Sequence, residues 1–378
     1  MTDISTAAFV RTETTAPKPP PRRTSGIVAW MQDNLFSSAS NTLLTLLGAW
    51  LIYLTIPPLL DWAFFSATWS GDGREDCLRE GAGACWPFID AKMGQFIYGR
   101  YPLEERWRVD WTFALGVAGL IPLLIPALPH KFLNVIYLLG IYPFVAFALL
   151  TGGMFGLPTV ETALWGGMLV TLVVAITGIV ASLPLGILLA LGRRSQLPII
   201  RMLCIGFIEI WRGVPLVTVL FMASVMLPLF LPEGITFDKL LRCLVAVALF
   251  SSAYMAEVVR GGLQAIPRGQ YEGAQALGLN YWKMMVFVIL PQALKIVIPG
   301  IVNTFIGLFK DTTLVMVIGL FDLLNIIQFN FTDPQWSTPQ TAVTGYVFAA
   351  FIYFVICSGM SQYSRYMERR LDTGHRND

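Results

Sequence analysis

The chain has 378 residues, of which 55% are hydrophobic and 13% are charged, and its formal net charge is +2. A soluble domain carries about 25% charged residues, so this composition excludes an ordinary soluble enzyme and indicates a protein that crosses a membrane several times. The near-neutral charge gives no global preference for nucleic acid or for another polyanionic partner.

Residues 1–25 are polar and rich in proline, and we expect a disordered cytoplasmic tail because such a composition cannot bury a core. A membrane-spanning helix needs about 20 mainly apolar residues. The apolar runs that satisfy this length predict an all-α fold with about eight spans, at about 42–65, 109–128, 132–152, 162–192, 203–231, 238–262, 293–312 and 341–363. The 162–192 and 203–231 runs are long, so tilt or interfacial extension is expected.

The spans fall into two groups. Residues 26–155 hold three spans and a polar loop at 66–108, and residues 160–365 hold five spans. The segment 313–330 is too short and too interrupted for a ninth span. We expect it to be a membrane-edge or re-entrant helix, which is tolerated only where protein covers its backbone.

The basic residues predict the orientation, because Lys and Arg near span ends favour the cytoplasmic side. Arg193, Arg194 and Arg201 flank one loop, and further arginines fill the C-terminal tail at 366–378. With eight spans, both termini and the segment 264–291 are then cytoplasmic. Loop 66–108 is then periplasmic, although it contains six basic residues; its length and its acidic residues weaken that objection.

The cysteines and histidines indicate little chemistry. Cys77 and Cys85 share the polar loop and could form a disulfide outside the cytoplasm, but spacing alone does not decide this. The other three cysteines lie in apolar runs. His130 and His375 are the two histidines of the sequence, and without paired ligand spacing we expect no metal site.

The stretch 272–291, EGAQALGLNYWKMMVFVILP, is polar and lies between two spans. We expect short helices at about 269–277 and 281–289, with Gly278 in left-handed backbone between them. Pro291 is expected to stop the second helix and to start the next element. Glu272 and Gln275 would form a polar face suited to docking on a soluble partner; the plainer interpretation is an amphipathic hairpin that only connects two spans.

This stretch resembles the EAA loop of ABC-importer permeases, with the pattern Glu-Ala-Ala, three residues, Gly, nine residues, Ile, one residue, Leu-Pro. Gly273 stands at the second position, which weakens the first helix by up to about 1 kcal/mol, and Val288 replaces the Ile. The residues that match at the required spacing are Glu272, Ala274, Gly278, Leu290 and Pro291. The resemblance assigns all of these except Val288 to coupling with an ATPase.

The resemblance continues on both sides of the loop. The stretches 252–270 (SAYMAEVVRGGLQAIPRGQ), 209–216 (EIWRGVPL) and 303–319 (NTFIGLFKDTTLVMVIG) are similar to polar amino-acid permeases. The extra N-terminal spans look like those of the M-type permease of general L-amino-acid importers. The resemblance thus covers residues 160–365 and implies a five-helix type I ABC importer permease core.

The resemblance also implies an assembly in a bacterial inner membrane. It comprises a cytoplasmic ATP-binding subunit dimer, a second permease that is favoured to be a different chain, and a periplasmic amino-acid-binding protein. ATP and Mg²⁺ belong to the ATPase, since this sequence lacks a Gly-x4-Gly-Lys-Ser/Thr phosphate loop, and no cofactor is expected in this chain. An ion-coupled secondary transporter is the alternative, although the inverted repeats common in that class are not evident.

Polar residues inside spans are the candidates for contact with an amino acid. Thr304 and Asp311 are seven residues apart and share a helix face. Asp311 could meet an ammonium group, could pair with Lys310 or Arg212, or could cap a helix break. Some cationic-amino-acid permeases carry a carboxylate at the position of Thr304. Its absence here argues against a strict preference for Arg, Lys or His.

Three other side chains have two interpretations each. Arg212 could bind a substrate carboxylate, but we favour a role in holding the backbone kinked at Pro215. Ser251 and Ser252 could contact substrate, although such hydroxyls more often bond to backbone or neighbouring helices. Glu257 and Arg260, three residues apart, are expected to form a local ion pair.

Overall fold

The computed structural model describes residues 26–125, 128–232, 234 and 237–371. The tail predicted at 1–25 and the last residues of the tail at 366–378 therefore lie outside the described residues. The chain divides into two compact units, the first ending at Ala67 and the second beginning at Thr68.

The first unit is helical. It contains α1 (Ile27–Asn34), α2 (Ala39–Leu60) and a π-helical turn (Asp61–Phe65). The Ser38 hydroxyl accepts a hydrogen bond from the Asn41 amide (3.1 Å) and so caps the start of α2. The stretch Ala39–Phe65 is long and apolar enough to cross a membrane, as the 42–65 run predicts.

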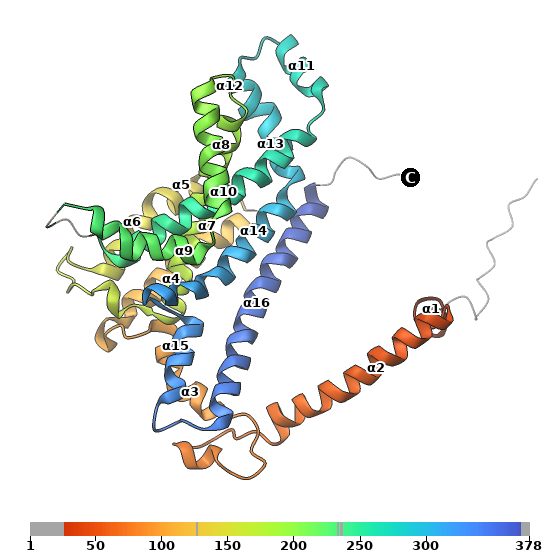
Figure 1. Ribbon diagram of the computed structural model, residues 1–378, viewed down its shortest axis with the longest axis vertical. Coiled ribbons are helices and arrows are strands. Elements are labelled where there is room, and N and C mark those ends of the chain that lie inside the picture. The colour runs from red at the N-terminus through yellow and green to blue at the C-terminus, as the bar shows by residue number, and fades with distance from the viewer. Residues whose placement is uncertain (1–25, 126–127, 233, 235–236, 372–378) are drawn as a thin grey trace, which may run out of the picture. The chain divides into compact units, whose positions relative to one another are not determined.

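The second unit consists of helices joined by short turns (Figure 1). Its helices are α3 (Trp86–Tyr98), α4 (Arg106–Leu124), α5 (Lys131–Ile136), α6 (Tyr142–Thr151), α7 (Gly167–Arg193), α8 (Pro198–Gly213), α9 (Leu216–Phe221), α10 (Lys239–Ala265), α11 (Arg268–Ala276), α12 (Tyr281–Met284), α13 (Leu290–Ile296), α14 (Ile298–Asp311), α15 (Leu323–Phe329) and α16 (Pro339–Leu371). Short π-helical turns lie at Tyr137–Ile141, Met222–Met226 and Met285–Ile289. Short 3-10 helices lie at Arg74–Cys77, Leu103–Glu105, Thr162–Leu164, Leu227–Phe230, Thr312–Ile318 and Asn330–Thr332. A two-residue strand, β1 (Phe321–Asp322), precedes α15.

The described chain contains seven helical stretches that could cross a membrane, or up to eight with one bent pair. That pair corresponds to the predicted span 203–231, where α8 and Leu216–Phe230 meet at 104°. The prediction of one long tilted helix at 203–231 is therefore wrong, whereas the predicted kink at Pro215 is confirmed. Val214 is extended (φ −111°, ψ 135°) because a residue before proline avoids helical backbone.

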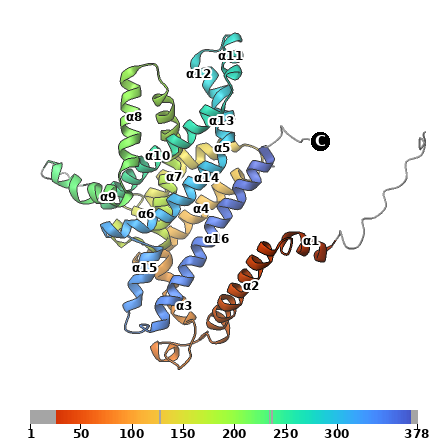
Figure 2. The same ribbon diagram turned by 45° about the vertical axis from the view of Figure 1, so that its right-hand side comes forward.

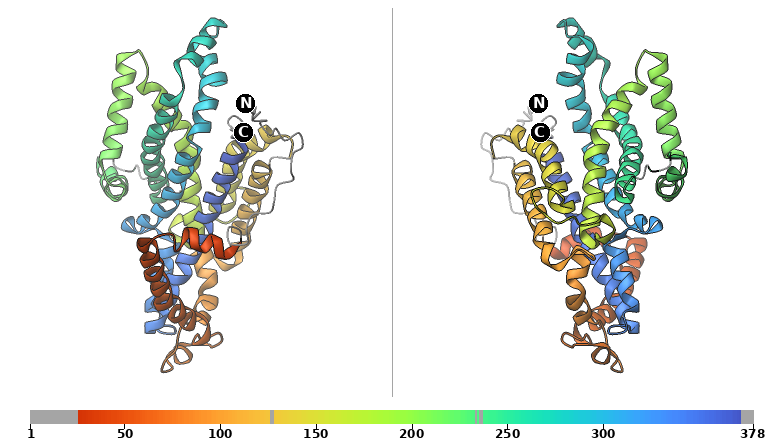
Figure 3. Two further views of the ribbon diagram at one scale, coloured as in Figure 1. Left: turned by 90° about the vertical axis from the view of Figure 1, so that its right-hand side faces the viewer. Right: turned by 90° about the vertical axis from the view of Figure 1, so that its left-hand side faces the viewer.

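The two polar segments lie at opposite ends of the second unit. The disulfide-bearing segment, α3 and α15 lie at one end, and α11, α12 and the C-terminal part of α16 lie at the other (Figures 1 and 2). Figure 3 shows that α8 and the α11–α12 segment project furthest at their end. This arrangement agrees with the predicted placement of 66–108 and 264–291 on opposite faces of the membrane.

α7 and α10 pack closely at the centre of the unit. In α10, 61% of the most apolar window is buried by the chain, more than in any other candidate span. A Cβ atom at Gly186 would lie 2.7 Å from the Met255 side chain and 3.0 Å from the Ala256 nitrogen. Small residues of this kind let membrane helices approach each other, so α7 and α10 form the frame on which other elements are placed.

The segment 313–330 divides between two elements: its first six residues belong to the stretch Ile298–Ile318, which could cross a membrane, and α15 follows after a turn. After the 3-10 helix, Gly319 turns in left-handed backbone (φ +71°), and β1 forms bridges to Gly166 and Gly167. The Leu323 amide donates to the Thr171 hydroxyl (2.9 Å), and buried Asp322 accepts from Tyr353 (2.9 Å). Protein groups thus bind the polar atoms of this segment, as the bilayer requires.

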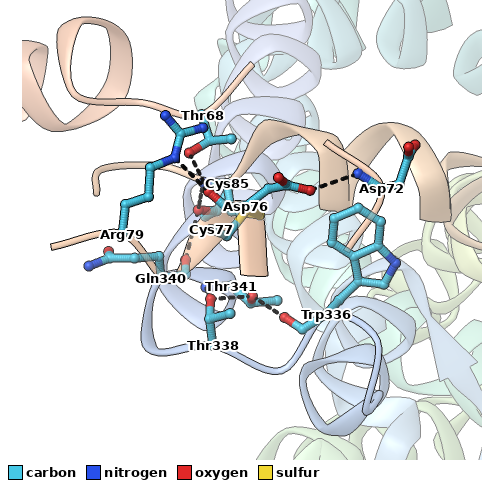
Figure 4. Close-up of a disulfide and its surroundings, with 11 residues drawn as sticks. Thr68, Asp72, Asp76, Cys77, Arg79, Cys85, Trp336, Thr338, Gln340 and Thr341 are labelled. Carbon is cyan, nitrogen blue, oxygen red and sulfur yellow. Dashed lines mark hydrogen bonds between the residues drawn. A yellow bond between two sulfur atoms is a disulfide. The ribbon is translucent and has the colours of Figure 1, made fainter. Parts of the chain in front are cut away.

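Cys77 and Cys85 form a disulfide, which resolves the alternative that the sequence leaves open (Figure 4). Both cysteines are buried in a cluster with Phe88, Ile327 and Trp336. The Cys85 amide donates to the Thr344 hydroxyl (2.9 Å), and the Gln335 side chain donates to the Asp72 carbonyl (3.0 Å). The loop is therefore held against α15 and α16.

An ion pair between Lys92 on α3 and Asp333 makes the same attachment sensitive to acid. The hydrogen bond from Lys92 holds the pKa of the Asp333 carboxyl below its usual range. A lowered pKa stabilises the fold above the ordinary Asp value of about 4, and this stabilisation is lost as the pH falls through the folded-state pKa. Because both side chains are partly exposed, we expect at most about 1 kcal/mol.

We expect Asp333→Asn to lower stability slightly at neutral pH and to reduce the acid-dependent loss. Thermal unfolding in detergent at pH 7 and pH 3.5 measures both effects. Asp90→Asn, which changes an exposed carboxylate on the same helix as Lys92, is the control. Equal acid sensitivity in Asp333→Asn and the unmodified protein contradicts the prediction.

Candidate functional site

The segment between α10 and α14 has the helix–glycine–helix form that its sequence predicts. α11 ends in two bonds, from the Gly278 amide to Gln275 (2.9 Å) and from the Leu279 amide to Ala274 (3.2 Å). These bonds define a Schellman motif, which requires left-handed backbone at Gly278 (φ +73°). Asn280 then caps α12 by accepting from the Lys283 amide (2.9 Å).

The exposure of α11 agrees with the predicted polar face. Glu272 and Gln275 are exposed, as is Gly273, whereas Ala274 is 4% exposed. Ala274 packs in an apolar cluster with Met284 and residues of α7 and α10. The segment therefore has one side attached to the membrane core and another open to a partner.

The prediction that Pro291 stops the second helix and starts the next element is correct in its second half: Pro291 lies in the first turn of α13, but the helical backbone does not stop before it. The π-helical turn Met285–Ile289 leads from α12 into α13 with Pro291 near the start of α13, and the helical course ends near Val297 (φ −102°, ψ 12°). The wider turn accommodates a residue that has no amide donor. Leu290 is half-buried and Pro291 is exposed, and together they join the α11–α12 segment to α13.

A cluster of charges lies where α7, α8 and α10 meet. Glu257, 15% exposed, accepts from Arg193 (2.6 Å) and Arg260 (2.7 Å) and lies 3.8 Å from Arg212. Arg193 also binds Glu209 (3.1 Å). We call these five residues the Glu257 hub; the predicted pair of Glu257 and Arg260 is confirmed within it.

Arg212 is the second-last residue of α8, just before the break. Its guanidinium carbon lies 5.7 Å from the ring centre of Tyr254, in addition to its contact with Glu257. Both partners belong to α10, so these contacts hold the end of α8 at the kink. This geometry favours the structural interpretation of Arg212.

The face of α14 with Thr304 and Asp311 has an open position between them. A Cβ atom at Gly307 would meet nothing within 4 Å. Thr304 donates to the Gly300 carbonyl (2.9 Å), and Asp311 is half-buried. In the described part of the chain Asp311 has no ion pair with Lys310 or Arg212, so the predicted internal pairing is not observed.

Ser251 and Ser252, the other candidate residues for substrate contact, are more buried than the residues on this face of α14. Ser251 is 4% exposed and Ser252 is fully buried, and the Ser252 hydroxyl donates to the Leu249 carbonyl (2.7 Å). Asn303 and Lys310, by contrast, are exposed on α14. Sequence reasoning did not use Asn303, although its spacing of four and seven residues from Gly307 and Lys310 places all three near one face.

A polytopic helical protein with a broken span, an open polar stripe in a membrane helix and a projecting helix–glycine–helix segment is a membrane-spanning transport subunit. The family model described as binding-protein-dependent transport system inner membrane component matches residues 182–373. This chain therefore belongs to that family of inner-membrane transport components.

Two curated relatives match along almost their whole length. The inner membrane amino-acid ABC transporter permease protein YhdY of Escherichia coli (strain K12) is 54% identical, with 95% of this chain and 96% of the relative covered. The glutamate/glutamine/aspartate/asparagine transport system permease protein BztC of Rhodobacter capsulatus is 41% identical, with 99% and 100% covered. Among solved structures, an amino acid ABC transporter crystallised with histidines matches 54% of this chain and 92% of its own, at 32% identity and a TM-score of 0.47.

Proposed function

We propose that this chain is a permease subunit of an ATP-binding-cassette importer that moves L-amino acids from the periplasm to the cytoplasm by alternating access. The observation that carries the proposal is the α11–α12 segment, which presents Glu272 and Gln275 outward and is joined to the membrane core on its other side. An ATPase can shift the membrane core between two conformations only if it binds this segment with a different affinity in each of them. The names of the two long relatives support the substrate class.

The proposal includes the partners that the family requires. A dimer of cytoplasmic ATP-binding subunits would bind ATP and Mg²⁺ and contact α11, and a periplasmic amino-acid-binding protein would deliver substrate. A second permease, a different chain, would complete the pathway with the core at 160–365, while the extension at 26–155 belongs to this subunit. Both termini would be cytoplasmic. The family match leaves the alternative of an ion-coupled secondary transporter without support.

For the substrate path we propose the open stripe of α14. Ionisable residues within spans face a bundle interior or a water-filled cavity, and Asp311 lacks an ion-pair partner among the described residues. Asp311 would meet the substrate ammonium group and Thr304 would donate or accept a hydrogen bond. With Thr304 in place of a carboxylate, neutral and acidic amino acids fit this path better than strictly cationic ones.

Reconstitution tests the proposal. The subunit, its partner permease and the ATPase are placed in proteoliposomes with the binding protein, and uptake of labelled glutamine or glutamate is measured with ATP. We expect Asp311→Asn to lower uptake at least about tenfold, as loss of one charged hydrogen bond does, with the complex still assembled. Asp90→Asn, which is exposed on α3, is the matched control.

Two results would contradict the proposal at different levels. Normal affinity and rate in Asp311→Asn remove this residue from the path and leave the permease role intact. Uptake that follows an ion gradient and does not require ATP overturns the importer itself.

A further inference from the structure

Polar contacts of two residues, Arg194 and Tyr271, help to join α11 to the membrane core. Arg194, which follows α7 directly, donates from Nη1 to the Tyr271 hydroxyl of α11 (3.0 Å) and to the Leu263 carbonyl of α10 (3.1 Å). The Tyr271 hydroxyl also donates to the same carbonyl (3.3 Å). We call this group the Arg194–Tyr271 clasp; it joins α7, α10 and α11 at one point.

The clasp is adjacent to the Glu257 hub in the sequence. Arg193 binds Glu257 and Glu209, and the next residue, Arg194, binds Tyr271. The guanidinium of Arg194 also lies over the Tyr271 ring, 5.5 Å from its centre. A displacement of Tyr271 therefore acts on the end of α7, which carries the residue that holds α8 and α10 together.

The other attachments of α11 are weaker or less directional. Gln292 on α13 donates to the Gln270 side chain (3.2 Å) between neutral groups, a bond that is exposed like that of Arg194 to Tyr271, and Ala274 contributes apolar packing. Beside the clasp, Arg268 and Glu272 line an open groove of about 440 Å³. This space lets α11 change its angle while the clasp keeps hold of one side.

We propose that the clasp transmits movement of α11 to α7 and the Glu257 hub, so that Arg194 and Tyr271 are positioning residues for coupling. The inference rests on the proposed coupling role of α11. Charge-assisted hydrogen bonds are short and directional, so a helix held by one follows its partner more closely than a helix held by apolar packing. The kinked α8 and the central α10 thereby receive the movement together.

The test uses the assembled complex in proteoliposomes, with uptake and ATP hydrolysis measured in the same sample. Tyr271→Phe removes the hydroxyl, and Arg194→Gln removes the guanidinium. We expect each to lower the amount of amino acid taken up per ATP hydrolysed at least about fivefold, the lower end of ordinary coupling between sites. Because both variants break one link, the double variant should be no worse than Arg194→Gln, and Arg194→Lys should recover part of the loss.

A matched control separates the clasp from general loosening: Gln270→Ala breaks the other polar attachment of the same helix. The clasp is overturned if Gln270→Ala uncouples as strongly as Tyr271→Phe, if both clasp variants keep the normal ratio, or if Tyr271→Phe prevents assembly. A separate experiment cross-links Glu272 to the ATPase. If no cross-link forms, α11 does not contact the ATPase, and both the proposed function of α11 and the role of the clasp are overturned.

Discussion

Gly278→Val should abolish most ATP-driven uptake while the protein still inserts in the membrane. The Gly278 backbone is left-handed (φ +73°), and a Cβ there would meet nothing within 4 Å. The penalty is therefore one of backbone conformation, roughly 1–2 kcal/mol for an ordinary residue, and a β-branched side chain is the least tolerant. In the valine variant the two backbone hydrogen bonds that end α11 would be lost. The face with Glu272 would then no longer meet its partner at the same angle.

The measurement is again uptake per ATP hydrolysed in the reconstituted complex. Gly273→Ala is the matched control, because Gly273 lies inside α11 with open space around it and alanine favours a helix by up to about 1 kcal/mol. Gly278→Asn should be intermediate, since asparagine tolerates left-handed backbone. Wild-type coupling in Gly278→Val would show that the turn geometry is not needed.

The local features of this protein are predictable because their causes are local. Gly278 and Asn280 end one helix and start the next through bonds within a few residues, and the spans follow from apolar length alone. Pro215 predicts the break after Gly213, but it does not predict the angle between the two helices that meet there. The 104° bend depends on the contacts of Arg212 with α10, which no periodicity reveals.

In the candidate site, too, the features with local causes are predictable from the sequence and the long-range contacts are not. The shared face of Thr304 and Asp311 follows from helical geometry, whereas the burial of Ser251 and Ser252 depends on the neighbours that cover their side of α10. Arg193 and Arg194 predict the orientation through their charge, yet their partners Glu257 and Tyr271 are 64 and 77 residues away. Contacts at such separations are products of the fold, and charge near a span end was their one sequence signal.

Pro291 shows a local rule that holds only in part: it lies in the first turn of α13, as predicted, but the helical backbone continues through it. Proline inside a helix costs about 3 kcal/mol because it lacks an amide donor and its ring clashes with the preceding turn. Here a π-helical turn takes up that conflict, and buried Met285 and Ile289 in the same turn hold it in the apolar cluster. The packing energy of the cluster therefore decides the course of the helix, and the coupling segment continues into α13 without a break.

Glu257→Gln should destabilise the membrane core. Removing one partner of a buried ion pair costs several kcal/mol because the remaining charge stays without compensation. Glu257 is 15% exposed, with three arginines around it, so we expect a loss on the order of 2–3 kcal/mol.

Thermal unfolding of the purified subunit in nanodiscs measures this loss, with Glu209→Gln as the control. Glu209 binds Arg193 as well, but its side chain is 55% exposed, and an exposed pair contributes at most about 1 kcal/mol. The Glu257 variant should therefore unfold at a clearly lower temperature than the Glu209 variant, and Arg212→Ala combined with Glu257→Gln should recover part of the difference by removing one uncompensated charge. Equal unfolding temperatures for the two glutamine variants would mean that apolar packing of α7 against α10 is sufficient and that the hub does not hold the kinked α8 in place.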